Sequence, residues 1–214
     1  MAIANWGFSL YLFATKSNAL KRYLFGLLFL IGTNSVAYSQ DFASDRINID
    51  ALYVDAGRSF LSQVGIDYNA PLSPWKNSYS NGLGVNYTAR LLFSSVVSLQ
   101  GTVGFDHYFG KTSQILTPPS KYSPENIYTV MPALRINVVR NTALLAGAGY
   151  SETYINGGNA GAFTWRGALG QMFRVNQTPV ALEVGYYSIQ YNGGTNSAIN
   201  ARLSIVLGIP RIRN

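Results

Sequence analysis

A two-residue alternation of apolar and polar side chains recurs eight times after residue 40 and constrains the fold more than any other feature. Successive side chains of a β-strand point to opposite faces, so each repeat predicts a strand with one apolar and one polar face. The last repeat is the most regular, with Asn200 and Arg202 on its polar face. Its apolar face consists of Ile199, Ala201, Leu203, Ile205, Leu207 and Ile209. A charged residue in the middle of such a strand suits a polar barrel interior, with the apolar face toward lipid.

The composition agrees with a single-domain membrane β-barrel. Charged residues make up 12% of the 214 residues, against about 25% in a typical soluble protein. The mean hydropathy of +0.09 is too low for a bundle of membrane helices. Aromatic residues reach 14% and there are 21 glycines, which fits aromatic girdles around a barrel and small residues in its lumen. The absence of cysteine excludes disulfides and a lipoprotein anchor.

The N-terminal residues predict secretion. A basic pair precedes a short apolar core at 23–31, and small residues follow at Ala37 and Ser39. This pattern is typical of a signal peptide cleaved near Ser39, and the apolar core is well short of the roughly 20 residues that span a membrane. We therefore expect a signal peptide with a long n-region over 1–39, and an outer-membrane barrel domain over 40–214 in a Gram-negative bacterium.

The net charge of +7 does not indicate a nucleic-acid partner. Three of the basic residues lie in the predicted signal peptide, and the rest are spread singly. Arg90, Arg135, Arg166 and Arg202 each lie inside an alternating strand. The basic runs and aromatic motifs of nucleic-acid-binding domains are missing from the sequence, so we expect no such partner.

The predicted strands are joined by links of alternating length. Those at 94–95, 140–141 and 175–178 are tight, whereas those at 62–79 and 111–125 are long and rich in proline. Links of intermediate length, rich in Gly and Asn, occupy 156–160 and 192–196. Such alternation is typical of an up-and-down barrel with short turns at one end. The strands are expected at 47–61, 80–93, 96–110, 126–139, 142–155, 161–174, 179–191 and 197–209.

Pro132 lies in the middle of the fourth predicted strand, on its apolar face. A closed barrel has no free edge at which the missing N–H of proline is harmless. We therefore expect a β-bulge or a local break in the strand pairing at this position.

Together these features resemble the small eight-stranded outer-membrane barrels of the OmpA transmembrane-domain, OmpX and Ail type. The resemblance covers residues 47–209 and implies an all-β, eight-stranded antiparallel up-and-down transmembrane β-barrel. It also implies that the barrel assembly machinery inserts the chain and that lipids and lipopolysaccharide surround it. Such barrels usually end on an aromatic residue, whereas this chain ends in Pro210-Arg211-Ile212-Arg213-Asn214.

Charged residues on the polar faces predict a network inside the lumen. An eight-stranded barrel encloses a lumen that side chains can fill, and buried charges must pair. Glu183 is expected to pair with Arg166 or Arg202 on the neighbouring strands, and the first strand contributes Asp50 or Asp55. The predicted network comprises Arg90, Asp106, Arg135, Arg166, Glu183 and Arg202.

His107 is the only histidine, so any histidine-dependent catalysis would use it. Its parity places it on the outer face near the loop end of its strand, as part of the aromatic girdle. Ser113 and Glu152 are conceivable partners for a lipid-modifying reaction, but their spacing matches no known signature. We expect no catalytic residues, no cofactor and no metal site, since a single histidine without cysteine supplies few ligands.

Aromatic and basic residues in or beside the long links are candidates for contact with lipopolysaccharide phosphates or with a host or other surface ligand. The alternative is that they extend the aromatic girdle. The candidates are Tyr68, Trp75, Lys76, Tyr79, Lys121 and Tyr122.

The sequence therefore predicts a non-enzymatic outer-membrane barrel with a structural or surface-interaction role. Three alternatives remain at this point: a narrow pore, a lipid-modifying outer-membrane enzyme, and a soluble secreted ligand-binding barrel with its apolar faces turned inward.

Overall fold

The computed structural model describes residues 48–55, 57, 59–113, 120–139, 141–175, 178–191 and 193–207. The predicted signal peptide and the C-terminal residues 208–214 lie outside this part. Within the described residues, two short helices and ten strands follow one another. They are α2 (Ile49–Asp55), β1 (Phe60–Pro71), η1 (Trp75–Asn77), β2 (Tyr79–Leu92), β3 (Val97–Gly110), β4 (Thr112–Ser113), β5 (Ser120–Lys121), β6 (Glu125–Val139), β7 (Thr142–Ile155), β8 (Gly158–Val175), β9 (Thr178–Tyr191) and β10 (Gly194–Leu207). No helix in the described part of the chain combines the length and apolarity needed to cross a membrane.

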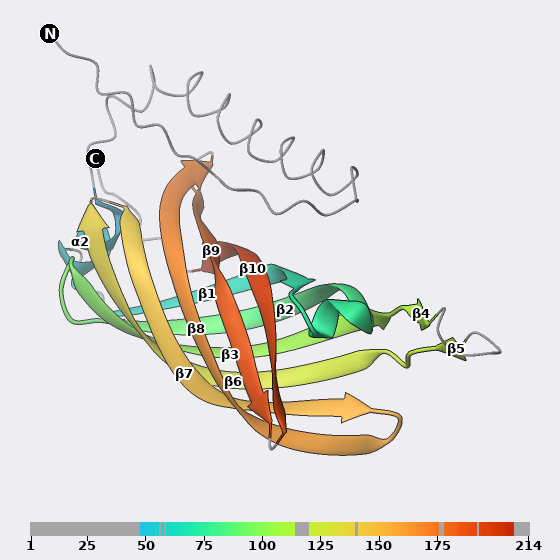
Figure 1. The fold of residues 1–214 in the computed structure, drawn as a ribbon. Coiled ribbons are helices and arrows are strands. Elements are labelled where there is room, and N and C mark those ends of the chain that lie inside the picture. The colour runs from blue at the N-terminus through green and yellow to red at the C-terminus, as the bar shows by residue number, and fades with distance from the viewer. Residues whose placement is uncertain are drawn as a thin grey trace, which may run out of the picture. The chain divides into compact units, whose positions relative to one another are not determined.

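The eight long strands form a closed barrel in the order β1-β10-β9-β8-β7-β6-β3-β2, in which every neighbouring pair is antiparallel (Figure 1). The barrel closes between β1 and β10, from Ser62 opposite Leu207 to Pro71 opposite Ala198. The short strands β4 and β5 pair with each other in a two-stranded extension beyond β3 and β6. The prediction of an eight-stranded antiparallel up-and-down barrel is confirmed.

The predicted first strand at 47–61 is wrong. Residues 49–55 form the helix α2, because the Asn48 side chain accepts hydrogen bonds from the backbone N–H groups of Asp50 (2.9 Å) and Ala51 (3.4 Å), as at a helix N-cap. Ile49 and Tyr53, one helical turn apart, are both buried in one apolar cluster. The first strand is instead β1 at 60–71, so the predicted long link at 62–79 shortens to 72–78.

The polar and apolar faces of the strands are oriented as the alternation predicts. Along β10, Asn200, Arg202 and Ser204 are buried, whereas Leu203 and Ile205 are exposed on the outer surface. Exposed aliphatic side chains form a band around the outside, and aromatic side chains such as Tyr128 and Phe163 lie toward one end of it. The barrel thus has a polar interior and an apolar exterior.

Pro132 interrupts the pairing of β6 on one side only. Toward β3 it lies opposite Gly101 in an unbroken register. Toward β7 the pairing stops after Val130 and resumes at Ala133 with the register unchanged. The missing N–H of proline therefore produces a local break without a β-bulge.

The two ends of the barrel differ in their links. We call the end with links 93–96, 140–141 and 176–177 the turn end, and the end with links 72–78, 111–124, 156–157 and 192–193 the loop end. The last two links are shorter than predicted, because β8 and β10 begin three residues earlier, at Gly158 and Gly194. Asn156 and Gly157 form a tight turn with φ values of 52° and 79°, the left-handed backbone that Asn-Gly hairpins favour.

Candidate functional site

The lumen at mid-depth contains a shared carboxylate. Glu183 on β9 lies 2.7 Å from Nη1 of Arg166 on β8, and 3.7 Å from Nη1 of Arg135 on β6. All three residues are buried. Gly170 makes room for this group, because a Cβ there would lie 3.0 Å from Nη1 of Arg135. One carboxylate therefore faces two guanidinium groups from different strands.

A second ion pair lies at the turn end. Arg90 on β2 is fully buried, and its Nη2 lies 2.7 Å from Oδ2 of Asp50 on α2. The Asn137 side chain donates a hydrogen bond of 2.7 Å to the same oxygen. Burial raises the pKa of Asp50, but the positive charges of Arg90 and Arg135 and the hydrogen bonds outweigh it, so the pKa lies below the ordinary 3.8. The ion pair with Arg90 and the hydrogen bond from Asn137 therefore hold α2 in the turn end of the barrel, with the Asp50 carboxyl ionised.

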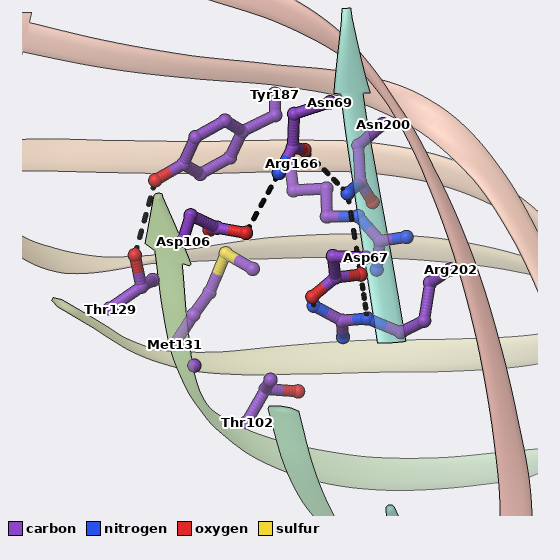
Figure 2. Close-up of a pocket in the computed structure, with 11 residues that line it drawn as sticks. Asp67, Asn69, Thr102, Asp106, Thr129, Met131, Arg166, Tyr187, Asn200 and Arg202 are labelled. Carbon is purple, nitrogen blue, oxygen red and sulfur yellow. Dashed lines mark hydrogen bonds and ion pairs between the residues drawn. The ribbon is translucent and has the colours of Figure 1, made fainter. Parts of the chain in front are cut away.

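The loop half of the lumen centres on Asp67 of β1, whose environment Figure 2 shows. Arg202 donates two hydrogen bonds to this carboxylate, from Nε (2.8 Å) and from Nη2 (3.0 Å). Asn86 donates a third (2.9 Å). Asp106 accepts a hydrogen bond of 2.7 Å from Asn69 and takes part in no ion pair among the described residues.

A small cavity of about 20 Å³ lies within this half, between β1, β3, β6, β8, β9 and β10 (Figure 2). This volume accommodates about one water molecule. Arg166, Asn200 and Arg202 line it, and each has a buried polar atom with no hydrogen-bond partner among the described residues. The cavity is far too small for a solute.

Aromatic side chains close the loop end of the lumen. Trp75 of η1 is only 3% exposed, and its ring lies 4.2 Å from that of Tyr108. Its Nε1 donates a hydrogen bond of 2.8 Å to Oε2 of Glu125, the first residue of β6. Tyr79 is buried in the same cluster. The proline-containing link 72–78 therefore folds inward rather than outward.

This placement corrects the expectation for the loop candidates. Trp75 and Tyr79 are buried because packing on Tyr108 and the bond to Glu125 hold the link inward, so neither side chain projects from the loop surface. Tyr68 lies on the outer face of β1, 38% exposed. Of the six candidates, Lys76, Lys121 and Tyr122 are exposed at the loop end.

The placement also shows which expected lumen residues meet. Glu183 meets Arg166 and Arg135, whereas Arg202 binds Asp67 instead of Glu183. Of the two acids expected from the first strand, Asp50 enters the lumen from α2, and Asp55 is exposed. The sequence analysis missed Asp67 and Glu125. The alternation of Val64, Ile66 and Tyr68 with polar residues over 62–70 is the signal that could have found Asp67.

The described residues show no catalytic constellation around His107. Its Nδ1 lies 2.7 Å from Oδ1 of Asn126, and its ring meets that of Phe109 edge-on at 4.8 Å. Glu152 accepts a hydrogen bond from Asn159. Nowhere in the described part of the chain do three His, Cys, Asp or Glu side chains gather as metal ligands would.

No protein-family model and no curated protein matches this sequence. Among solved structures, the outer-membrane protein Ail of Yersinia pestis in a nanodisc is similar, with 12% identity and a TM-score of 0.47 over 69% of this chain and 99% of that chain. The N-terminal β-barrel domain of Pseudomonas aeruginosa OprF has 8% identity and a TM-score of 0.43, over 70% and 98% of the two chains. Neisserial surface protein A has 14% identity and a TM-score of 0.42, over 69% and 96%. At these identities and TM-scores the comparison reports a likeness in fold alone, and the eight-stranded antiparallel barrel of this chain is established by its own strand pairing.

Proposed function

We propose that this chain is an integral outer-membrane protein whose plugged, non-conducting barrel is a scaffold for surface interactions at the loop end. One observation carries the proposal: a closed barrel has its ion pairs inside and its large apolar side chains outside. In water, an apolar band around the whole molecule would drive association. In a bilayer the same band is the surface that lipid chains solvate.

The inward position of the polar strand faces argues against a soluble secreted barrel. Such a barrel would need the apolar faces inside, around a ligand, and the arginines in water. Here Arg90, Arg135 and Arg202 are buried, while Ile66 is 61% exposed on the outer surface.

Fractionation tests this proposal. The native chain should partition with the outer membrane and migrate faster on gels when unheated, because a folded barrel resists detergent. Leu134→Arg and Leu203→Arg place a charge on the outer face at mid-depth and should impair insertion, since that charge costs about 2–4 kcal/mol. Leu134→Ala, which adds no charge, is the control. Normal assembly of both arginine variants would contradict the orientation.

The closure of both ends supports a barrel that does not conduct. α2 fills the turn end, Trp75 fills the loop end, and the ion pairs occupy the space between them. Planar-bilayer recording of the native protein should show no discrete single-channel events. Regular conductance steps would favour the narrow pore instead.

We place the surface interaction at the exposed lysines of the loop end. All lysines of the described residues lie there, namely Lys76, Lys111 and Lys121, with Tyr122 beside them. Ammonium groups above a membrane rim suit lipopolysaccharide phosphates. Changing the three lysines to Gln should weaken binding of lipopolysaccharide, whereas Arg174→Gln at the turn end should not. Equal binding by both variants would argue against this contact.

We infer no enzymatic activity. Only one histidine is present, and its ring nitrogen faces an amide. Lipid A mass spectra of cells with and without the protein should be identical; a new or missing acyl group would favour the lipid-modifying alternative.

A further inference from the structure

A cleft of about 380 Å³ opens at the loop end, beside the buried aromatic cluster of Trp75, Tyr79 and Tyr108. It lies where the last residues of β7 and β9 meet the first residues of β6, β8 and β10. Its size falls within the range of clefts that bind small molecules. Its lining consists of Tyr79, Glu125, Thr153, Ile155, Gly158, Asn159, Ala160, Tyr191 and Asn196.

Glu125 is the one charged residue of this lining, and it is 1% exposed. Its Oε2 accepts the hydrogen bond from Trp75 (2.8 Å). Its Oε1 has only a long contact of 3.4 Å with the Tyr191 hydroxyl, beyond the usual range for O–H···O bonds. Glu125 takes part in none of the ion pairs formed by the described residues.

An uncompensated carboxylate in such a place is costly unless a cation approaches it. Three lumen carboxylates show the contrast, because Asp50, Asp67 and Glu183 each have an arginine within ion-pair distance. Asp106 has no ion pair among the described residues either, but the cavity that it lines is too small for a solute. Glu125 differs from these in lining a cleft that a ligand can enter.

The remaining lining suits an organic cation rather than a bare metal ion. Tyr79 and Tyr191 supply aromatic rings, on whose faces ammonium groups bind favourably. The Tyr191 ring is held by a hydrogen bond of 2.7 Å between its hydroxyl and Thr153. Asn159 and Asn196 add neutral polar groups, and Ile155 and Ala160 add apolar surface for the body of a ligand.

We propose that this cleft binds a small organic amine, with its ammonium group on Oε1 of Glu125 and its apolar part against Ile155 and Ala160. The ammonium replaces the long contact from Tyr191 with a charge-assisted hydrogen bond. The site stands on its own residues and is separate from the lysines of the proposed surface interaction.

Calorimetric titration of the detergent-solubilised, folded protein tests this site. The probes are phenethylamine and 2-phenylethanol, which share a phenyl ring and differ in the charged group. The amine should bind about tenfold or more tightly than the alcohol, as expected for a charge-assisted bond. Glu125→Gln keeps an acceptor for Trp75 but removes the charge, so the amine should lose this advantage. Asp55→Asn removes an exposed acid at the turn end and should leave the binding unchanged.

A second variant keeps the test decisive if Glu125→Gln does not fold. Ala160→Trp fills the cleft without changing the carboxylate, and it should abolish binding of the amine. The proposal is overturned if the amine and the alcohol bind equally, or if the amine does not bind in the millimolar range. It is also overturned if a folded Glu125→Gln or Ala160→Trp variant binds the amine as the native protein does. Tighter binding of the alcohol, or of a sugar such as glucose titrated in parallel, would point to a neutral ligand and equally overturn it.

Discussion

The two ends of the lumen are closed by different chemistry. At the turn end a helix enters the barrel, its Asp50 paired with Arg90 at 2.7 Å and its Ile49 and Tyr53 buried against the strands. At the loop end an aromatic cluster closes the lumen, in which Trp75 makes one hydrogen bond to a carboxylate and packs against the Tyr108 ring. The first closure combines an ion pair with a helical face, and the second combines aromatic packing with one hydrogen bond from a neutral donor.

We therefore expect the two closures to contribute unequally to the free energy of unfolding. Breaking a buried ion pair leaves a charge uncompensated, which costs more than the loss of a single hydrogen bond from a neutral donor. The ion pairs Arg90–Asp50 and Arg166–Glu183 lie below the loop half and Arg202–Asp67 lies within it, whereas no ion pair of the described residues belongs to the aromatic cluster that closes the loop end, so rigidity should be lowest at that closure. The loop end, with its uncompensated Glu125, is the end that can adapt to a ligand.

The largest expected loss of stability follows from Glu183→Ala, which leaves two buried guanidinium groups without their shared carboxylate. This substitution should lower the free energy of unfolding by about 3–5 kcal/mol. The midpoint of urea unfolding in lipid vesicles measures this effect. Glu152→Ala removes a carboxylate near the loop end that hydrogen-bonds Asn159 and takes part in no ion pair of the described residues, and it should shift the midpoint far less. Equal shifts would mean that Glu183 lies in a wet pore rather than in a packed lumen.

Next in size is Asp50→Ala, which tests the turn-end closure itself. Arg90 would lose its ion-pair partner, but this change leaves one buried guanidinium uncompensated rather than two, so we expect about 3 kcal/mol, at the lower end of the range for a broken buried ion pair. Asp55→Ala lies in the same helix but is exposed, and should shift the unfolding midpoint little. If the two substitutions act alike, α2 is not held by its ion pair.

The alternation was enough to predict the strands from residue 80 onward, because each faces lipid on one side and the lumen on the other. Boundaries differ by at most three residues, as at 158 against 161 and 194 against 197. The segment 47–61 was misread because α2 is stabilised by packing into the barrel mouth, which is a non-local contact. Local spacing alone cannot distinguish that helix from a short strand.

The charge network of the lumen was also predictable only in part, because some of its pairs depend on non-local contacts. Glu183 and Arg166 lie on neighbouring strands, so parity alone placed them on one face. Asp67 and Arg202 are directly opposite, but only through the closure of β1 against β10, across most of the chain. The inward turn of Trp75 depends on Glu125, which lies 50 positions away. An aromatic residue in a proline-rich link fits a girdle equally well.

A smaller effect is expected at the loop end, from Trp75→Phe. This change keeps an aromatic ring but removes the donor to Glu125, so the free energy of unfolding should fall by about 1–2 kcal/mol. Trp165→Phe on the outer face is the matched control, and it should change stability by no more than about 0.5 kcal/mol. A loss at Trp75 larger than that of Asp50→Ala would reverse the ranking of the two ends.

The smallest effect is the acid dependence of the turn-end closure. Because the pKa of Asp50 is lower in the folded protein than the ordinary 3.8, the contribution of its charge is complete above that value. It is lost as the pH falls below 3.8 toward the folded pKa, where the carboxyl binds a proton in both states. Native protein and Asp50→Asn should therefore differ in unfolding midpoint at neutral pH and converge in acid. Trp165→Phe, on the outer face and outside every ion pair of the described residues, should keep a more constant difference from the native protein over the same range. A gap between native protein and Asp50→Asn that stays constant down to strongly acidic pH would show that the charge of Asp50 does not hold the helix, and that apolar packing alone closes the turn end.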